Sequence, residues 1–141
     1  MKYYFDECTS DRLVRFLREL GAEPPLIPKD LEILHVGECS MHGLSRGMPD
    51  ISWMPIVAAQ NWIAVTVDNN IRRRKEERRV RAEAKLRVVY LHEDFAEMKR
   101  REQAVFLLTA WPNIVARTLT ARAGECFIVQ KNHAVKGAET K

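Results

Sequence analysis

The sequence predicts an α/β fold whose largely parallel sheet is covered by helices on both faces. Short apolar runs rich in β-branched or aromatic residues alternate with longer segments of helical periodicity through most of the chain. The 141 residues are 46% hydrophobic and 30% charged, which is typical of a soluble globular domain with one sizeable core. We therefore expect strands and helices to alternate within a single domain.

The first third of the chain contains two expected strands and one expected helix. Tyr3-Tyr4-Phe5 is a β-prone aromatic run. A helix is predicted over 11–20, because apolar residues recur there at helical spacing and Gly21 follows. Ile33-Leu34-His35-Val36 is the second short apolar run, and a glycine-containing loop from Cys39 to Pro49 leads to the next helix.

The middle third predicts two further helices and two further strands. Apolar residues at helical spacing indicate a helix over about 51–61, and the run at 63–67 indicates a strand. A single basic helix is expected over 71–84. The apolar run at 86–91 then predicts the fourth strand.

The last third predicts one long helix and one strand. Helical periodicity extends over about 95–120, and Pro112 is expected to interrupt it. The run at 126–130 predicts the final strand. We expect one folded domain over 1–132 and a flexible polar tail over 133–141.

Two classes of protein are excluded by the pattern of apolar residues. No run approaches the roughly 18 apolar residues of a membrane-spanning helix. The first seven residues end in two acids without an apolar segment, so no secretory signal is visible. The three cysteines, Cys8, Cys39 and Cys126, cannot all pair within one chain. We therefore expect a cytoplasmic protein with reduced thiols and no membrane association.

The net charge of +4 is distributed unevenly along the chain. The segment 72–87 holds nine basic and three acidic residues, a net charge of +6, so the remaining 14 basic and 16 acidic residues sum to −2. Such a concentrated basic segment favours an anionic partner, most often nucleic acid. A solvated helix face is the alternative, because Glu76, Glu77 and Glu83 can pair locally with neighbouring arginines.

Three acids fall at or near the ends of expected strands. Asp6 closes the first strand, Asp68 closes the third, and Asp50 begins the helix between the second and third. In open α/β sheets the ligand site lies beyond the carboxyl ends of the strands. Together the acids would form a cluster suited to Mg²⁺ or Mn²⁺. Each also has a local structural explanation, as a helix N-terminal acid or a turn cap.

Three short motifs in a fixed order carry a resemblance to a known family. They are Phe5-Asp6-Glu7 before an amphipathic helix, Gly47-Met48-Pro49-Asp50 before a helix containing Ala58-Ala59, and Ile63-Ala64-Val65-Thr66-Val67-Asp68-Asn69-Asn70. Together they resemble the PIN-like domains, including the VapC-type toxins of bacterial toxin–antitoxin modules. The resemblance covers Tyr3 to about Leu91.

This resemblance implies a three-layer α/β/α sandwich that uses clustered carboxylates and Mg²⁺ or Mn²⁺ to cut RNA. The positions that match its catalytic and metal-binding acids are Asp6, Asp50 and Asp68. The supporting positions are Glu7, Thr66, Asn69 and Asn70. Thr66 matches a threonine beside the metal cluster, whereas Glu7 ranks lower because strand alternation points it away from Asp6. Family members often carry an acid where this chain has Asn70, whose amide supplies an oxygen but no charge.

The basic segment begins just after the last of these acids. We expect Arg72, Arg73, Arg74 and Lys75 to contact the RNA backbone, which gives salt-dependent affinity and little sequence specificity. Docking of an acidic antitoxin segment is a competing use. The apolar helical stripe that includes Phe106, Leu107 and Trp111 is expected to belong to the core. The family also commonly dimerises, and any apolar surface in excess of the core would supply a contact for a homodimer.

The first functional hypothesis is therefore a Mg²⁺- or Mn²⁺-dependent endoribonuclease, the toxin of a type II toxin–antitoxin pair. The second is a catalytically weakened PIN-like module that binds RNA or protein, which Asn70 keeps open. A small phosphoacceptor-type domain also places aspartates at strand ends, but it requires a lysine after a later strand that is not evident here.

Overall fold

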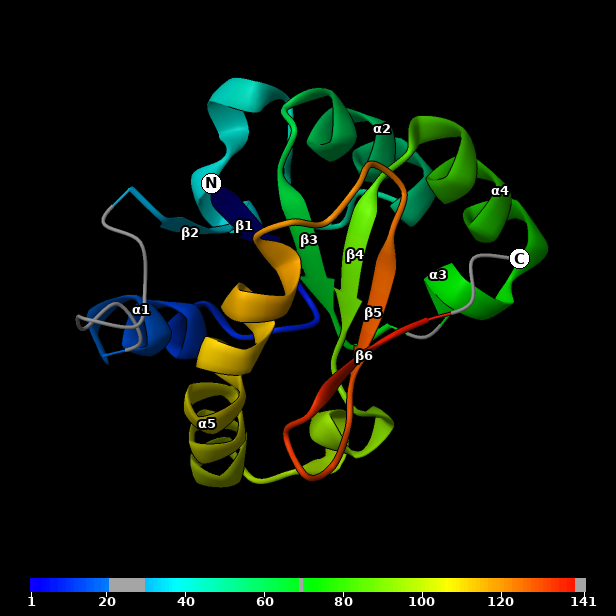
Figure 1. The fold of residues 1–141 in the computed structure, drawn as a ribbon. Helices are drawn as coiled ribbons and strands as arrows, with labels where there is room; N and C mark the ends of the chain where they lie inside the picture. The colour runs from blue at the N-terminus through cyan, green and yellow to red at the C-terminus, as the bar shows by residue number, and fades with distance from the viewer. Residues whose placement is uncertain (21–29, 69, 139–141) are drawn as a thin grey trace.

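The computed structural model describes residues 1–20, 30–68 and 70–138, and shows a three-layer α/β/α sandwich (Figure 1). This confirms the predicted fold class. The strands are β1 (Lys2–Phe5), β2 (Glu32–His35), β3 (Ile63–Thr66), β4 (Arg87–Tyr90), β5 (Cys126–Val129) and β6 (Val135–Gly137). The α-helices are α1 (Asp11–Leu20), α2 (Asp50–Ala59), α3 (Asn70–Arg73), α4 (Lys75–Ala84) and α5 (Arg100–Thr118). Short 3₁₀ helices are η1 (Val36–Glu38), η2 (Ser40–His42) and η3 (Glu93–Glu97).

The sheet has the strand order β2-β1-β3-β4-β5-β6 and is parallel from β2 to β5. From β1 the chain passes to one side to form β2, then crosses back to the other side of β1 to form β3. This reversal of direction makes the carboxyl ends of β1 and β3 neighbours, with Phe5 in register with Val65. Ligand sites of open α/β sheets lie at such a switch point.

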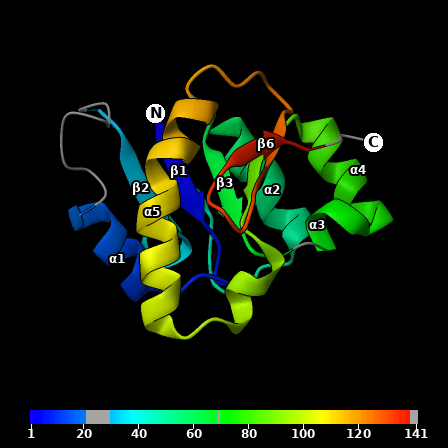
Figure 2. The same cartoon turned by 60° about the horizontal axis from the view of Figure 1, so that its bottom comes forward.

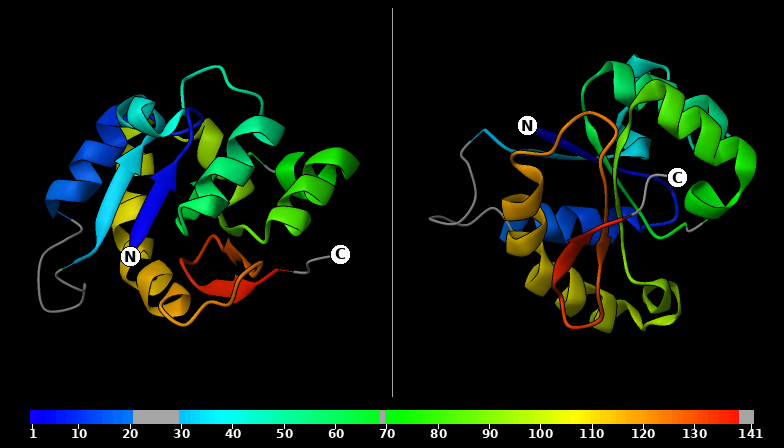
Figure 3. Two further views of the ribbon diagram at one scale, coloured as in Figure 1. Left: turned by 90° about the horizontal axis from the view of Figure 1, so that it is seen from above. Right: turned by 45° about the vertical axis from the view of Figure 1, so that its right-hand side comes forward.

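Side-chain alternation along the strands divides the core between the two faces of the sheet. Tyr3 and Phe5 belong to the cluster under α1 and α5, whereas Tyr4 belongs to the cluster under α2. Trp111 on α5 is fully buried and meets Tyr3 edge-on with ring centroids 4.9 Å apart. Figures 2 and 3 show α1 with α5 on one face, and α2 with α4 on the other.

The basic segment forms two helices instead of the single helix predicted over 71–84. α3 ends at Arg73, and Arg74 takes an extended backbone (φ −72°, ψ 135°) before α4 begins at Lys75. The break divides the four consecutive cations, with Arg72 and Arg73 on α3 and Lys75 on α4. It also allows α4 to pack against α2.

Pro112 does not interrupt α5, contrary to the expectation from sequence. The helix runs without a break from Arg100 to Thr118, because the face carrying Trp111, Ile114 and Val115 is buried against the sheet. The free energy gained by burying these apolar side chains exceeds the cost of the backbone hydrogen bond that the proline cannot donate. The helix also begins later than predicted, since residues 93–97 form η3.

A sixth strand lies within the segment that was expected to be a flexible tail. β6 pairs antiparallel with β5, with Val135 opposite Val129. Backbone pairing and the partly buried Val135 hold this segment on the sheet. Residues 139–141, and Gly21 as the predicted end of α1, lie outside the described residues. In the described part of the chain, no helix is long and apolar enough to cross a membrane.

Replacing Pro112 with alanine should raise the free energy of unfolding by about 1 kcal/mol, because alanine restores a backbone donor inside α5. Urea denaturation followed by circular dichroism measures the change. Pro112→Gly is the matched control, since it restores the same N–H with a helix propensity about 1 kcal/mol poorer. An unchanged or lower stability of the alanine variant would contradict this account of α5.

Candidate active site

The carboxyl ends of β1 and β3 are joined by a hydrogen-bonded chain that passes through Thr66. The Thr66 hydroxyl donates to Oδ2 of Asp6 at 2.7 Å and accepts from the backbone N–H of Asp68 at 3.0 Å. Both Asp6 and Thr66 are buried. The chain therefore orients the Asp6 carboxylate and the backbone that leads into Asp68 with a single side chain.

The Asp6 carboxylate is in an unfavourable environment for a charge. Among the described residues, nothing donates a hydrogen bond to its buried Oδ1 atom. Burial is the main reason that the pKa of Asp6 is raised to about 7, and repulsion from Asp50 and Asp68 adds to it. Hydrogen bonds from the Thr66 hydroxyl and from the backbone N–H of Cys8 oppose this rise. A buried, half-satisfied carboxylate of this kind is stabilised by a proton or by a cation.

Asp50 reaches the same region from the first turn of α2. Its Oδ1 accepts a hydrogen bond from the Trp53 indole at 2.9 Å, which fixes the carboxyl on the helix. Its pKa is raised mainly by burial, against the lowering effect of Trp53. Repulsion from the Asp68 carboxylate and a hydrogen bond to it raise the pKa further. Asp50 and Asp68 are therefore direct neighbours, although they lie 18 positions apart in the sequence.

Glu7 holds the loop that leads to Asp50. Its Oε2 atom accepts a hydrogen bond from the backbone N–H of Gly47 at 3.0 Å. Gly47 has φ of +80°, a conformation that strains other residues. The exposed Glu7 thus contributes to the site by positioning this loop.

Cys8 provides a second indication that the acids converge. The pKa of its thiol is raised to about 12, first by desolvation and then by repulsion from Asp6, Asp68 and Asp50. The carboxyl groups therefore share one negative region. Within the described ranges, however, no three His, Cys, Asp or Glu side chains form a ready metal-ligand group. Thr66 and Trp53 hold the oxygens of Asp6 and Asp50 in their present directions.

Glu77 is a further acid at this site that the sequence reading assigned only to local pairing. It lies on α4 with 16% of its side chain exposed, and its charge contributes to the raised pKa of Asp50. It also forms an ion pair with Arg74 at 3.7 Å. It lies in the first turn of α4, the second helix after β3, and its signal in the sequence is an acid within the basic segment that follows Asp68.

The predicted supporting amides fall at the limit of the described structure. Asn69 lies outside the described residues, and Asn70 is described only as the first backbone position of α3. Their expected roles therefore stay predictions.

The four predicted RNA-binding cations do not form one cluster. The Arg72 guanidinium lies over the Tyr90 ring at 5.8 Å from its centroid, and Arg73 pairs with Glu93 at 3.4 Å. Arg74 turns to Glu77, as described above, and Lys75 is exposed. The break between α3 and α4 directs the first two cations toward the carboxyl end of β4 and leaves the third beside the acids.

Comparison with known proteins gives one match. A family model described as a PIN like domain matches residues 1–93, which include β1 to β4 and all three candidate acids. No curated protein and no solved structure matches this chain.

The stability of the metal-free protein should carry a pH dependence that originates at Asp6. Because the pKa is about 7 in the folded state and near 3.8 in the unfolded state, the unfolded chain loses this proton first as the pH rises. The folded state is therefore penalised progressively between about pH 4 and pH 7, and fully above that range. The difference between the two pKa values corresponds to a loss of about 4 kcal/mol in the free energy of unfolding.

We expect Asp6→Asn, which is uncharged and nearly isosteric, to remove this penalty. Urea denaturation in EDTA measures the free energy of unfolding of both proteins. The value for the variant should exceed that for the wild type by almost nothing at pH 4 and by a few kcal/mol at pH 8. A difference between the two proteins that stays constant with pH would exclude a proton on Asp6 as its source.

Proposed function

The chain belongs to the PIN-like domain family, and from this premise we propose that it is a metal-dependent endoribonuclease that hydrolyses phosphodiester bonds in RNA. PIN domains are generally nucleases, and the α/β/α sandwich of this chain is a nuclease-type fold. Hydrolysis adds water across a P–O bond and yields one phosphate end and one hydroxyl end.

The observation that carries the proposal is the buried Asp6 carboxylate, with one oxygen unpartnered and two further carboxylates close by. Leaving a buried charged acceptor unsatisfied costs about 1–3 kcal/mol or more, so a purely structural aspartate is disfavoured here. Sites that tolerate such a cost are commonly functional. A divalent cation or a proton would relieve it.

The donor set fits Mg²⁺ or Mn²⁺, because both ions prefer oxygen ligands and the nearby acids supply carboxylate oxygens. Asp6, Asp50 and Asp68 would hold the ion. The chemistry that such an ion supplies when bound is activation of water and neutralisation of charge at the phosphate.

The side chains around the acids keep them in position for this task. Thr66 orients Asp6, Trp53 orients Asp50, and Glu7 holds the loop that precedes α2. Asp6 and Asp50 both have raised pKa values, so binding of a cation must displace protons from them near neutral pH. Arg72, Arg73, Arg74 and Lys75 would bind phosphates on either side of the cleaved bond.

The biological setting we propose is that of a cytoplasmic toxin in a type II toxin–antitoxin pair. An antitoxin with an acidic segment would compete with RNA for the basic residues after β3. A homodimer would cover large apolar side chains exposed on α1 and α5, among them Leu20, 46% exposed, and Val105, 60% exposed.

A second candidate function is a PIN-like module that binds RNA or protein with little or no cleavage. It is favoured by Asn70, which stands where relatives often carry an acid, and by the absence of a ready ligand group among the described residues. The two candidates differ in whether the carboxylates do chemistry.

Incubation with structured and single-stranded RNAs in Mn²⁺ or Mg²⁺ separates them. We expect cleavage that EDTA abolishes and that Asp6→Asn or Asp68→Asn reduces by roughly 100-fold or more, the scale of losing a positioned catalytic group. Asp30→Asn is the matched control, because Asp30 is exposed and lies just before β2, away from the acids.

Cleavage that survives both substitutions would show that the assigned acids are not the active site. RNA binding without cleavage across all substrates would establish the second candidate instead. A thermal shift of the wild-type protein by Mn²⁺, absent in Asp6→Asn, reports metal binding independently of activity.

A further inference from the structure

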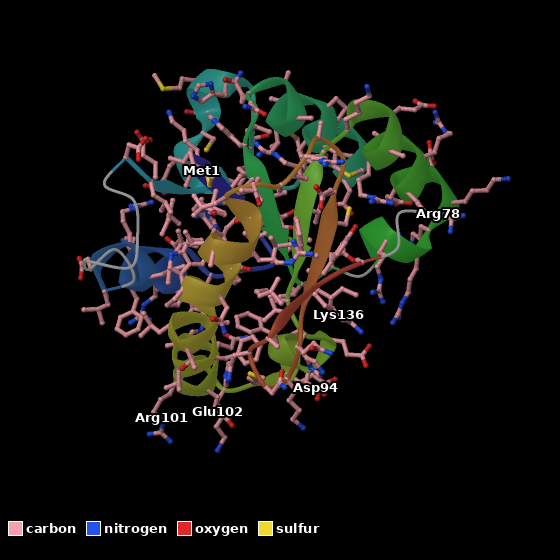
Figure 4. The ribbon with its side chains drawn as sticks, in the orientation of Figure 1. Met1, Arg78, Asp94, Arg101, Glu102 and Lys136 are labelled. Atoms are coloured by element: carbon pink, nitrogen blue, oxygen red, sulfur yellow. The ribbon has the colours of Figure 1, made fainter. Side chains whose placement is uncertain are left out.

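A cavity of about 500 Å³ lies at the carboxyl edge of the sheet, beside the candidate acids but without them. The elements that surround it are α3, the segments after β4 and β5, and β6. Its lining residues are Arg72, Leu91, His92, Glu93, Ile128, Gln130, Lys131, Asn132 and Lys136. Figure 2 turns this edge of the molecule toward the viewer, and Figure 4 labels Lys136 on β6. The volume is within the usual range for small-molecule sites.

The cavity is close enough to the acids to receive the same ligand. The backbone N–H of Leu91, in its wall, donates to the carbonyl of Thr66 at 2.9 Å, and Thr66 contacts Asp6. Leu91 follows β4, which is two strands from β1, the strand that precedes Asp6. Adjacent strands lie about 4.8 Å apart, so the near wall of the cavity lies roughly 10 Å from the end of β1. An extended polynucleotide spans that distance in one or two nucleotides.

The charge of the cavity is opposite to that of the acid cluster. Arg72, Lys131 and Lys136 face one acid, Glu93. Glu93 is itself paired with Arg73 at 3.4 Å. The ion pair of Lys131 with Asp94 is long, at 3.9 Å, and 78% of the lysine side chain is exposed, so it screens the positive charge weakly. The cavity therefore favours a phosphate.

The remaining lining residues suit a nucleobase. Ile128, which is partly buried and lies opposite Lys136 in the β5–β6 pair, provides an apolar surface, and the carboxamides of Gln130 and Asn132 supply donors and acceptors at the rim. The Oδ1 atom of Asn132 already accepts from the N–H of Ala134, which leaves the amide N–H₂ group as the donor. A peptide segment made mainly of Asp and Glu would use the cations but would leave Ile128 without an apolar contact.

We propose that this cavity binds one nucleotide of single-stranded RNA that flanks the scissile phosphate, with its base against Ile128 and its phosphate on Lys136 and Arg72. This inference rests on the proposed nuclease function for the role of the bound strand. It names the substrate class as RNA with an unstacked base, because a base within a duplex is not free to enter a cavity.

The first test measures nucleotide binding in EDTA, where no cleavage occurs. Backbone amide NMR shifts are followed during titration with the four nucleoside 5′-monophosphates and, separately, with ribose 5-phosphate. The proposal expects shifts at Leu91, Gln130 and Asn132 and at least about tenfold tighter binding of one nucleotide than of ribose 5-phosphate. If the nucleotides and ribose 5-phosphate bind equally tightly, the cavity recognises only the phosphate, and the proposal is overturned. Shifts caused by a poly-glutamate peptide and by no nucleotide would overturn it in favour of protein docking.

The second test uses a labelled single-stranded RNA octamer in fluorescence anisotropy, again in EDTA. Lys136→Gln should weaken binding roughly tenfold at 0.1 M salt and reduce the slope of log K against log salt by about 1. Lys85→Gln is the matched control, because Lys85 is an exposed lysine at the opposite edge of the sheet, after α4. Equal effects of the two substitutions would contradict a site at the cavity.

The two proposals fail in distinguishable ways. Nucleotide binding in the cavity without any RNA cleavage would end the nuclease proposal and leave the binding site. Cleavage by the wild-type protein that Lys136→Gln leaves unchanged, together with the absence of nucleotide shifts, would end the cavity proposal and leave the nuclease.

Discussion

The hydrogen bond between Thr66 and Asp6 is the interaction on which the rest of the site depends. It joins the carboxyl ends of β1 and β3, the two strands between which the direction of the sheet reverses. The same hydroxyl accepts from the backbone N–H of Asp68, so one side chain orients the Asp6 carboxylate and the backbone at Asp68. Asp50 joins them from α2, where Trp53 fixes its carboxyl. Burial of the Asp6 carboxylate, with two further acids beside it, is costly without a proton or a cation, and it raises the pKa of Asp6.

Charge is divided along the carboxyl edge of the sheet. The acids occupy the ends of β1 and β3 and the start of α2, and the cations of α3, the β5–β6 turn and β6 lie on the other side of β4. A ligand that spans this edge must offer groups for a cation site at one end and negative charge at the other. An extended polynucleotide satisfies both requirements with one repeated chemical unit. The division explains why the net charge of +4 reveals little about the protein by itself.

Local sequence patterns were sufficient for most of the fold. The helix over 11–20 and the strands near 2–5, 63–66 and 87–90 follow from apolar periodicity and from short apolar runs, because their burial is decided by their own side chains. The failures have tertiary causes. Burial of the Trp111 face carries α5 through Pro112, and the break at Arg74 precedes a helix, α4, that packs against α2. β6 forms because β5 is available as a partner strand. The polar sequence of this segment does not by itself predict a strand.

By itself, the sequence determined the α/β class and the order of its elements, and it placed Asp6, Asp50 and Asp68 at the ends or starts of those elements. These properties depend on the spacing of residues along the chain. Only the tertiary structure decided which side chains meet: the neighbourhood of Asp50 and Asp68, the approach of Glu77 and the cavity beside Leu91. Such contacts depend on strand order and on the direction of helices, which are set by how separate apolar faces pack together. The spacing of residues along the chain does not specify that packing.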